Sequence, residues 1–188
     1  MKIKSHHIKQ FNQQMFVSAI QSELYSPIKT GDLRRVQKLM KQLNVTNPIV
    51  FKSPTNGSLN TALDVAAQYG QLGILEFIAD QLGDINPYNN AGETPLHYAV
   101  FYNKTDIVKY YLESNITDKN PRSKSNDKYR GRTPLHDASQ RGFIEIVKLI
   151  LPFIKDKNPA DDSLITPLHM AALTQCAHSI REGEVASK

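Results

Sequence analysis

The feature that most limits what this chain can fold into is a six-residue motif that recurs along it. The motif is written as TPLHYA from Thr94, as TPLHDA from Thr133 and as TPLHMA from Thr166. A weaker copy, TALDVA, starts at Thr61, so successive copies begin 33, 39 and 33 residues apart. Self-similarity at a period of about 33 residues predicts a row of stacked structural units instead of one globular core.

Each copy of the motif encodes the start of a helix. The residue before a proline is pushed into extended backbone, which suits an N-cap position, and a threonine hydroxyl there accepts a hydrogen bond from the first turn. Proline then takes the first helical position, where its missing N–H has no cost. The leucine and the alanine fall on nearby faces, which predicts a short helix with one buried side. We assign these motif residues to structure: Thr94, Pro95, Leu96, His97, Thr133, Pro134, Leu135, His136, Thr166, Pro167, Leu168 and His169.

A second helix is predicted after each copy of the motif. A glycine or an asparagine stands nine residues after the threonine, and both residue types suit a left-handed turn between two helices. Apolar residues at helical spacing follow, and an Asn-Pro pair then stops the helix. The turn residues are Gly70, Asn103 and Gly142, and the apolar stretches are 74–78, 107–112 and 146–150.

This pattern resembles that of ankyrin repeats over roughly residues 22 to 176. The resemblance implies an all-α solenoid of stacked helix-turn-helix units joined by hairpin-like loops. Two positions depart from the family pattern. Leu164 stands where the family has a glycine, which predicts an irregular hairpin turn, and Asp64 replaces the motif histidine, so its hydrogen bonding must differ.

The chain divides into a repeat domain and two terminal segments. The N-terminal segment is a basic arm that contains the pair His6-His7 and whose second half is predicted to be helical. We interpret that pair as part of a solvated arm, not as a metal site. The segments are 1–21 for the arm, 22–176 for the repeats (about 22–56, 57–89, 90–128, 129–161 and an incomplete 162–176) and 177–188 for a polar tail.

Composition narrows the class of protein further. The chain has 188 residues, 40% hydrophobic and 22% charged, which fits one soluble domain. Its apolar runs are too short to cross a bilayer, and no hydrophobic segment led by Lys or Arg suggests a signal peptide. The single cysteine, Cys176, fits a reducing compartment. We therefore expect a monomeric protein of the cytoplasm or the nucleus that does not bind membranes.

Catalysis finds little support in the sequence. The repeated histidines are one repeat apart, and the family resemblance implies that they are structural. Cys176 has no visible base partner, and neither a phosphate-binding glycine loop nor a metal-ligand spacing occurs. We predict no catalytic residue, cofactor or metal. A weaker alternative is that the chain is a regulatory fragment of a larger multidomain protein or enzyme.

The resemblance to ankyrin repeats implies instead a concave groove that binds another protein. The variable groove positions follow the motif alanines, at 68–69, 101–102 and 140–141, and the residue after the histidine position is also expected there, as at Val65 and Met170. We predict an aromatic centre, with the alternative that Phe101 or Tyr102 fills the core beside Val100. The candidate binding residues are Tyr69, Tyr98, Phe101, Tyr102, Asp137, Gln140, Arg141, Lys128, Arg130 and Arg132.

A basic insertion at 119–132 offers a second mode of binding. It holds six basic residues against Asp127, a net charge equal to the formal +5 of the whole chain. Such an excess favours acidic surfaces, so electrostatic binding to nucleic acid through this loop is the alternative function. The simpler interpretation is a solvated loop. Tyr129 is the one aromatic residue among these charges. Since bases stack on aromatic side chains, this counts against nucleic-acid recognition.

Overall fold

The computed structural model describes residues 23–43, 50–52, 59–126 and 129–174. The predicted basic arm, Lys128, Cys176 and the polar tail lie outside these residues.

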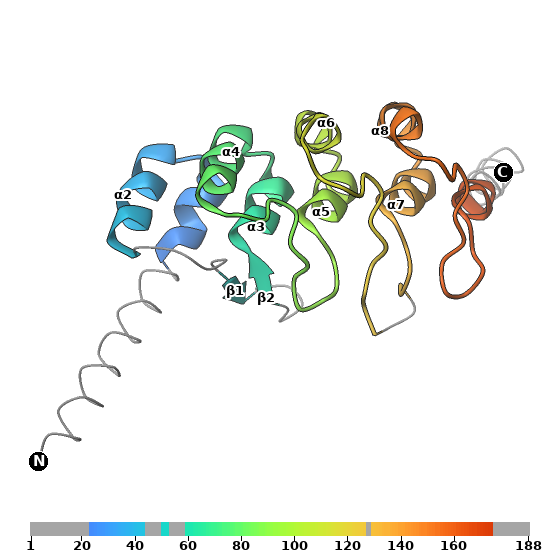
Figure 1. Ribbon diagram of the computed structural model, residues 1–188, viewed down its shortest axis with the longest axis horizontal. Helices are drawn as coiled ribbons and strands as arrows, with labels where there is room; N and C mark the ends of the chain where they lie inside the picture. The colour runs from blue at the N-terminus through green and yellow to red at the C-terminus, as the bar shows by residue number, and fades with distance from the viewer. Residues whose placement is uncertain (1–22, 44–49, 53–58, 127–128, 175–188) are drawn as a thin grey trace, which may run out of the picture.

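The helices form two layers that run side by side along a row (Figure 1). Each unit places its first helix in the layer next to the hairpin loops and its second helix in the outer layer. The all-α repeat architecture is confirmed. The first helices are 23–30, α3 (Ala62–Tyr69), α5 (Pro95–Phe101), α7 (Pro134–Arg141) and 167–174, and the second helices are α2 (Leu33–Leu43), α4 (Leu72–Gln81), α6 (Thr105–Glu113) and α8 (Ile144–Ile150), which continues as the 3-10 turn η1 (Leu151–Phe153).

One short β-hairpin interrupts the helical pattern in the described part of the chain. Strands β1 (Val50–Lys52) and β2 (Leu59–Thr61) pair antiparallel, with Phe51 opposite Asn60. The hairpin is built from the insertion that precedes the weaker motif copy, and it leads directly into α3.

The core is a stripe that runs along the stack between the two layers. The motif leucines of three consecutive units, Leu63, Leu96 and Leu135, are at most 1% exposed. The small motif alanines are also buried, and α3 packs on α5 as α5 packs on α7. Each unit therefore buries its apolar side against the next unit. Leu168, which holds the same motif position in 167–174, is 68% exposed.

The turns between paired helices have the predicted left-handed backbone. The φ angles are +76° at Gly70, +55° at Asn103 and +69° at Gly142. Glycine adopts this region without steric cost, and asparagine adopts it more readily than other residues with a Cβ.

The hairpin turn at Leu164 is regular, so the prediction of an irregular turn was wrong. The Leu164 amide donates to the Asp161 carbonyl at 3.0 Å, and the Gly92 amide donates to the Asn89 carbonyl at the same distance. Leu164 keeps this geometry by adopting a φ of +62°, against +74° at Gly92. A left-handed backbone costs a residue with a Cβ about 1–2 kcal/mol, so the turn holds strain.

Replacing Leu164 by glycine is expected to raise the free energy of unfolding by about 0.5–1 kcal/mol, because glycine removes the backbone strain at some cost in chain entropy. The side chain is 78% exposed, so little packing is lost. Leu164→Ala is the matched control, since it removes the side chain but keeps a Cβ, and it should leave stability nearly unchanged. Urea unfolding followed by circular dichroism measures both. An equal gain in the two variants would assign the effect to the exposed leucine and not to the backbone.

Candidate functional site

The motif histidines link each unit to the next. The Thr94 amide donates to Nδ1 of His97 at 3.2 Å, so the neutral ring carries its proton on Nε2, which lies 3.4 Å from the Arg132 carbonyl of the following unit. His136 repeats the link to the Ile165 carbonyl at 3.0 Å. Burial lowers the pKa of His97 to about 4, which keeps the ring neutral. These histidines are used in helix caps and inter-repeat bonds, one repeat apart, and do not converge on one centre.

Asp64 takes over the role of the histidine in the weaker motif copy. Its Oδ2 accepts hydrogen bonds from the Thr61 amide at 2.7 Å and from the Asn89 side-chain amide, in the hairpin loop that leads into α5, at 3.1 Å. Burial raises the pKa of Asp64 to about 7, while the bonds from Thr61 and Asn89 act in the opposite direction. A motif histidine donates to the hairpin loop that follows its helix pair, whereas Asp64 accepts a hydrogen bond from that loop. The link is therefore kept, with its direction reversed.

Tyr98 belongs to this buried polar network, so its predicted place in the exposed aromatic centre was wrong. The side chain is 7% exposed, and its hydroxyl donates to Oδ1 of Asn60 at 3.0 Å. Val65 and Met170, at the same motif position, are 0% and 4% exposed. The position after the histidine thus faces inward in these units, whereas Asp137 is half-buried.

The positions that follow the motif alanines are accessible, as predicted. Phe101 is 42% and Tyr102 39% exposed, so the alternative that they fill the core was wrong. Tyr69 is half-buried, and Gln140 and Arg141 are exposed.

Neighbouring units join these side chains into a continuous row. Lys29 of the first unit lies over the ring of Tyr69 at 5.3 Å. The rings of Phe101 and Tyr102 meet edge to face with centroids 5.1 Å apart, and the guanidinium of Arg141 lies over Phe101 at 3.5 Å. Burial, followed by the proximity of Tyr69, raises the pKa of Tyr102. Cations from adjacent units thus flank the aromatic rings at both ends of the row.

Tyr25 is a member of this row that the sequence analysis missed. Its hydroxyl lies 3.4 Å from the hydroxyl of Tyr69. Burial, together with that contact, raises the pKa of Tyr25 to about 12. Tyr25 lies six residues before Gly31, in the register of His97 before Asn103 and not in that of Tyr102, so the motif register did not indicate that it joins the row. We refer to Tyr25, Tyr69, Phe101 and Tyr102 as the aromatic row.

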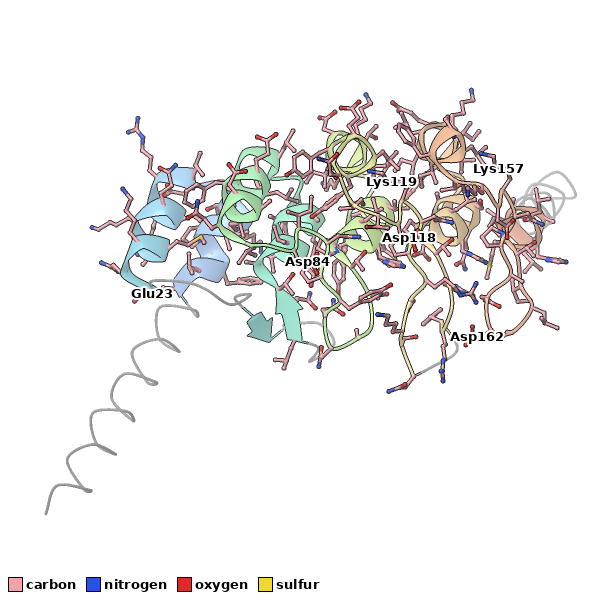
Figure 2. All side chains as sticks on the ribbon, viewed as in Figure 1. Glu23, Asp84, Asp118, Lys119, Lys157 and Asp162 are labelled. Atoms are coloured by element: carbon pink, nitrogen blue, oxygen red, sulfur yellow. The ribbon has the colours of Figure 1, made fainter. Side chains whose placement is uncertain are left out.

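The basic insertion is docked on the next hairpin loop, so the interpretation of a freely solvated loop was wrong for its described part. Nη2 of Arg122 lies 2.9 Å from Oδ1 of Asp162, and Nε of Arg130 lies 3.1 Å from Oδ2 of the same residue. Nε of Arg132 lies 3.6 Å from Oδ2 of Asp161. Figure 2 shows Asp162 beside the hairpin loops, and it is the residue with which both Arg122 and Arg130 form ion pairs. The two aspartates of the next hairpin offset part of the net charge of +5 that the insertion carries.

The side chain of Lys119 caps the C-terminal end of α6. Its ammonium group donates to the carbonyls of Tyr111 and Ser114, and Lys157 donates in the same way to those of Leu151 and Ile154. Figure 2 shows the two lysines at corresponding places in neighbouring units. Lys119 is therefore not a free charge of the basic loop.

In the described part of the chain, the asparagine of an Asn-Pro pair does more than end a helix, which sequence reasoning missed. Oδ1 of Asn86 accepts a hydrogen bond from the Leu96 amide at 3.2 Å, and Oδ1 of Asn120 accepts one from the Leu135 amide at 3.1 Å. These bonds satisfy amides in the first turns of α5 and α7 that lack a helical partner. The loops are thereby tied to the helices that follow them.

Within the described residues, no helix has both the length and the apolar character needed to cross a bilayer. The same residues contain no cluster of three or more His, Cys, Asp or Glu side chains suited to a metal ion.

The chain matches a family model described as ankyrin repeats (3 copies), over residues 27–123 and 111–182. It is 29% identical to a probable E3 ubiquitin-protein ligase of rice, XBOS33, over 147 residues, which is 77% of this chain and 26% of the relative. It is also 29% identical to the Arabidopsis thaliana E3 ubiquitin-protein ligase XBAT33, over 83% of this chain and 34% of the relative. A putative ankyrin repeat protein of fowlpox virus, FPV223, is 28% identical over 62% of this chain and 77% of its own length. This chain thus spans about a quarter to a third of the matched plant ligases.

Proposed function

Because the chain belongs to the ankyrin-repeat family, a family of protein-binding modules, we propose that it binds a partner protein on the face formed by its first helices and hairpin loops. The observation that carries the proposal is the aromatic row. Large apolar side chains at exposed positions tend to mark contact sites. Tyr and Arg often dominate the binding energy of interfaces, and Arg141 lies directly on Phe101.

The contacts between neighbouring side chains support this assignment. Aromatic rings that are held by adjacent rings and cations lose little conformational entropy when a partner binds. Phe101 and Tyr102 combine this order with exposed fractions near two fifths. The side chains of the aromatic row are therefore already ordered for binding, as are the few residues that contribute most of the binding energy in known interfaces.

The role that we propose is that of an adaptor or recognition module without catalysis. The repeat region is what the chain has in common with the plant E3 ubiquitin-protein ligases, and it spans at most about a third of them. A module of this kind selects the protein on which a larger assembly acts. The buried histidines His97 and His136 are committed to caps, so neither serves general acid–base chemistry.

Binding to nucleic acid through the basic insertion is the weaker alternative. The ion pairs of Arg122 and Arg130 with Asp162 count against it, because they offset the positive charge that phosphates would need. Steep loss of binding with rising salt would be the sign of that alternative, whereas an aromatic interface responds weakly to salt.

Replacing Phe101 and Tyr102 together by alanine is expected to weaken partner binding about tenfold or more, because the pair forms the exposed centre of the row. The melting temperature should change little, since both side chains are exposed. Partners captured by crosslinking to the full chain are identified by mass spectrometry, and their affinities are measured by titration calorimetry.

Phe153→Ala is the matched control, because Phe153 is 47% exposed but lies in η1 of the outer layer. It should leave the affinity unchanged. Unchanged affinity in the Phe101/Tyr102 variant, or equal losses in this variant and the control, would contradict the proposed binding face.

A further inference from the structure

A pocket of about 510 Å³ opens beside the aromatic row, between α5, α7 and the hairpin loop at 129–132. Phe101 and Tyr129 form aromatic walls, and the guanidinium groups of Arg132 and Arg141 line the same space. Each guanidinium is paired with one of the rings, Arg141 with Phe101 at 3.5 Å and Arg132 with Tyr129 at 4.7 Å.

Arg141 is the donor of this pocket to which the described residues offer no hydrogen-bond acceptor. Among the described residues, no hydrogen bond or ion pair engages its guanidinium. Cζ of Arg141 lies 3.5 Å from the centroid of the Phe101 ring, so the group rests against the ring. A contact of this kind uses none of the five N–H donors, whose planar arrangement fits the two oxygens of a carboxylate.

Gln140 adds a second, oriented donor. Its Oε1 accepts a hydrogen bond from Nη1 of Arg132 at 3.1 Å, which leaves the side-chain NH₂ group as the free end of the amide. Arg132 is in turn held by Asp161, whose Oδ2 is 3.6 Å from its Nε. A chain of contacts from the neighbouring hairpin thus fixes the amide of Gln140 beside Arg141.

Two acids share the lining with these donors, Glu93 and Asp137. Asp137 lies one helical turn before Arg141 in α7, yet no ion pair joins the two among the described residues. Burial raises the pKa of Asp137 to about 6, and the charges of Arg132 and Arg141 act in the opposite direction. An acidic ligand must oppose the charge of Asp137, so its affinity is expected to rise as that carboxyl becomes protonated.

We propose that this pocket binds an aspartate or glutamate side chain of an extended partner segment, with its carboxylate on Arg141 and Gln140 and its neighbouring apolar residue on Phe101 and Tyr102. The inference rests on the proposed function, since it names the chemistry that the same face selects. Charge complementarity at Arg141 is what commits the site to an acidic residue rather than to an amide or a cation.

The experiment uses the full 188-residue chain and a library of ten-residue peptides in which each pool fixes one residue type at one position. Pools with Asp or Glu should be retained about tenfold more than the matched Asn or Gln pools, because a hydrogen-bonded charge is lost in the amide. Arg141→Gln should abolish that preference. Arg34→Gln, the same change at an exposed arginine of α2 in the outer layer, should preserve it.

Two further variants keep the result interpretable. Arg141→Lys retains the charge but loses the planar guanidinium. The preference for acidic pools should therefore be weaker than in the parent chain, and this holds as a test if Arg141→Gln folds poorly.

Asp137→Asn should raise retention of the acidic pools at pH 7.5. In the parent chain, retention should increase from pH 7.5 to pH 5.5 as Asp137 protonates, and Asp137→Asn should remove that increase.

An acidic preference that survives in Arg141→Gln would overturn the inference, and so would enrichment of basic or phosphorylated pools. Failure to retain any peptide pool would overturn it as well. If the Phe101/Tyr102 double variant binds the crosslinked partner more weakly than the parent chain, the proposed function stands in each of these cases. If the double variant binds that partner as tightly as the parent chain, the proposed function itself is contradicted.

Discussion

Replacing Leu96 by alanine is expected to lower the free energy of unfolding by about 2–5 kcal/mol, the range for buried leucines. The same change at Leu168 should cost less than about 0.5 kcal/mol, as at other exposed positions. The two leucines hold the same place in the motif, but Leu96 is fully buried in the stripe between units and Leu168 is 68% exposed. The local helix start is alike in both, so the difference isolates burial between units.

Urea unfolding followed by circular dichroism measures both variants. The dependence of the free energy on urea should be recorded for each, because repeat arrays can unfold in more than one step. Similar losses at Leu96 and Leu168 would contradict the arrangement, since they would mean that Leu168 is packed in solution as tightly as Leu96.

Replacing Gly92 by alanine is expected to lower the free energy of unfolding by about 2–4 kcal/mol, through backbone strain and overpacking together. Gly92 has a φ of +74°, and a Cβ there would stand 2.3 Å from the Lys124 carbonyl carbon and from the Ser125 amide nitrogen. These are backbone atoms of the next hairpin, and the Lys124 amide donates to the Gly92 carbonyl at 2.7 Å. The two loops would have to separate to admit a methyl group.

Gly142→Ala is the matched control for that variant. Gly142 has a similar φ of +69°, but a Cβ there would meet nothing within 4 Å. This change should cost only about 1 kcal/mol, from the left-handed backbone alone. Thermal and urea unfolding compare the two. Equal losses would show that the hairpins are not in contact at Gly92.

The repeat architecture could be predicted from the sequence because its determinants are local. Threonine before proline, a glycine or asparagine nine residues later and the spacing of apolar residues each act within one unit. The helix starts at Pro95 and Pro134 and the left-handed turn at Asn103 follow from such short-range preferences.

The candidate site was predicted less well because it depends on contacts between units. Tyr98 was expected at the surface, but the Asn60 acceptor that draws it inward lies 38 residues away. The arginines of the insertion were expected to be free, but Asp161 and Asp162 belong to the following hairpin. The exposure of Phe101 and Tyr102 was predicted correctly because their positions follow from the motif register alone, whereas their role in binding stays a prediction.

The links made by His97 and His136 give the array a direction. Each imidazole N–H points forward to a carbonyl of the following unit, at Arg132 and at Ile165. Ending the chain before Arg132 would leave the buried N–H of His97 without its acceptor, whereas a chain that starts at Arg132 would keep the carbonyl and lose only a donor that water can replace. Shortened versions should therefore tolerate loss of their leading units better than loss of their trailing ones.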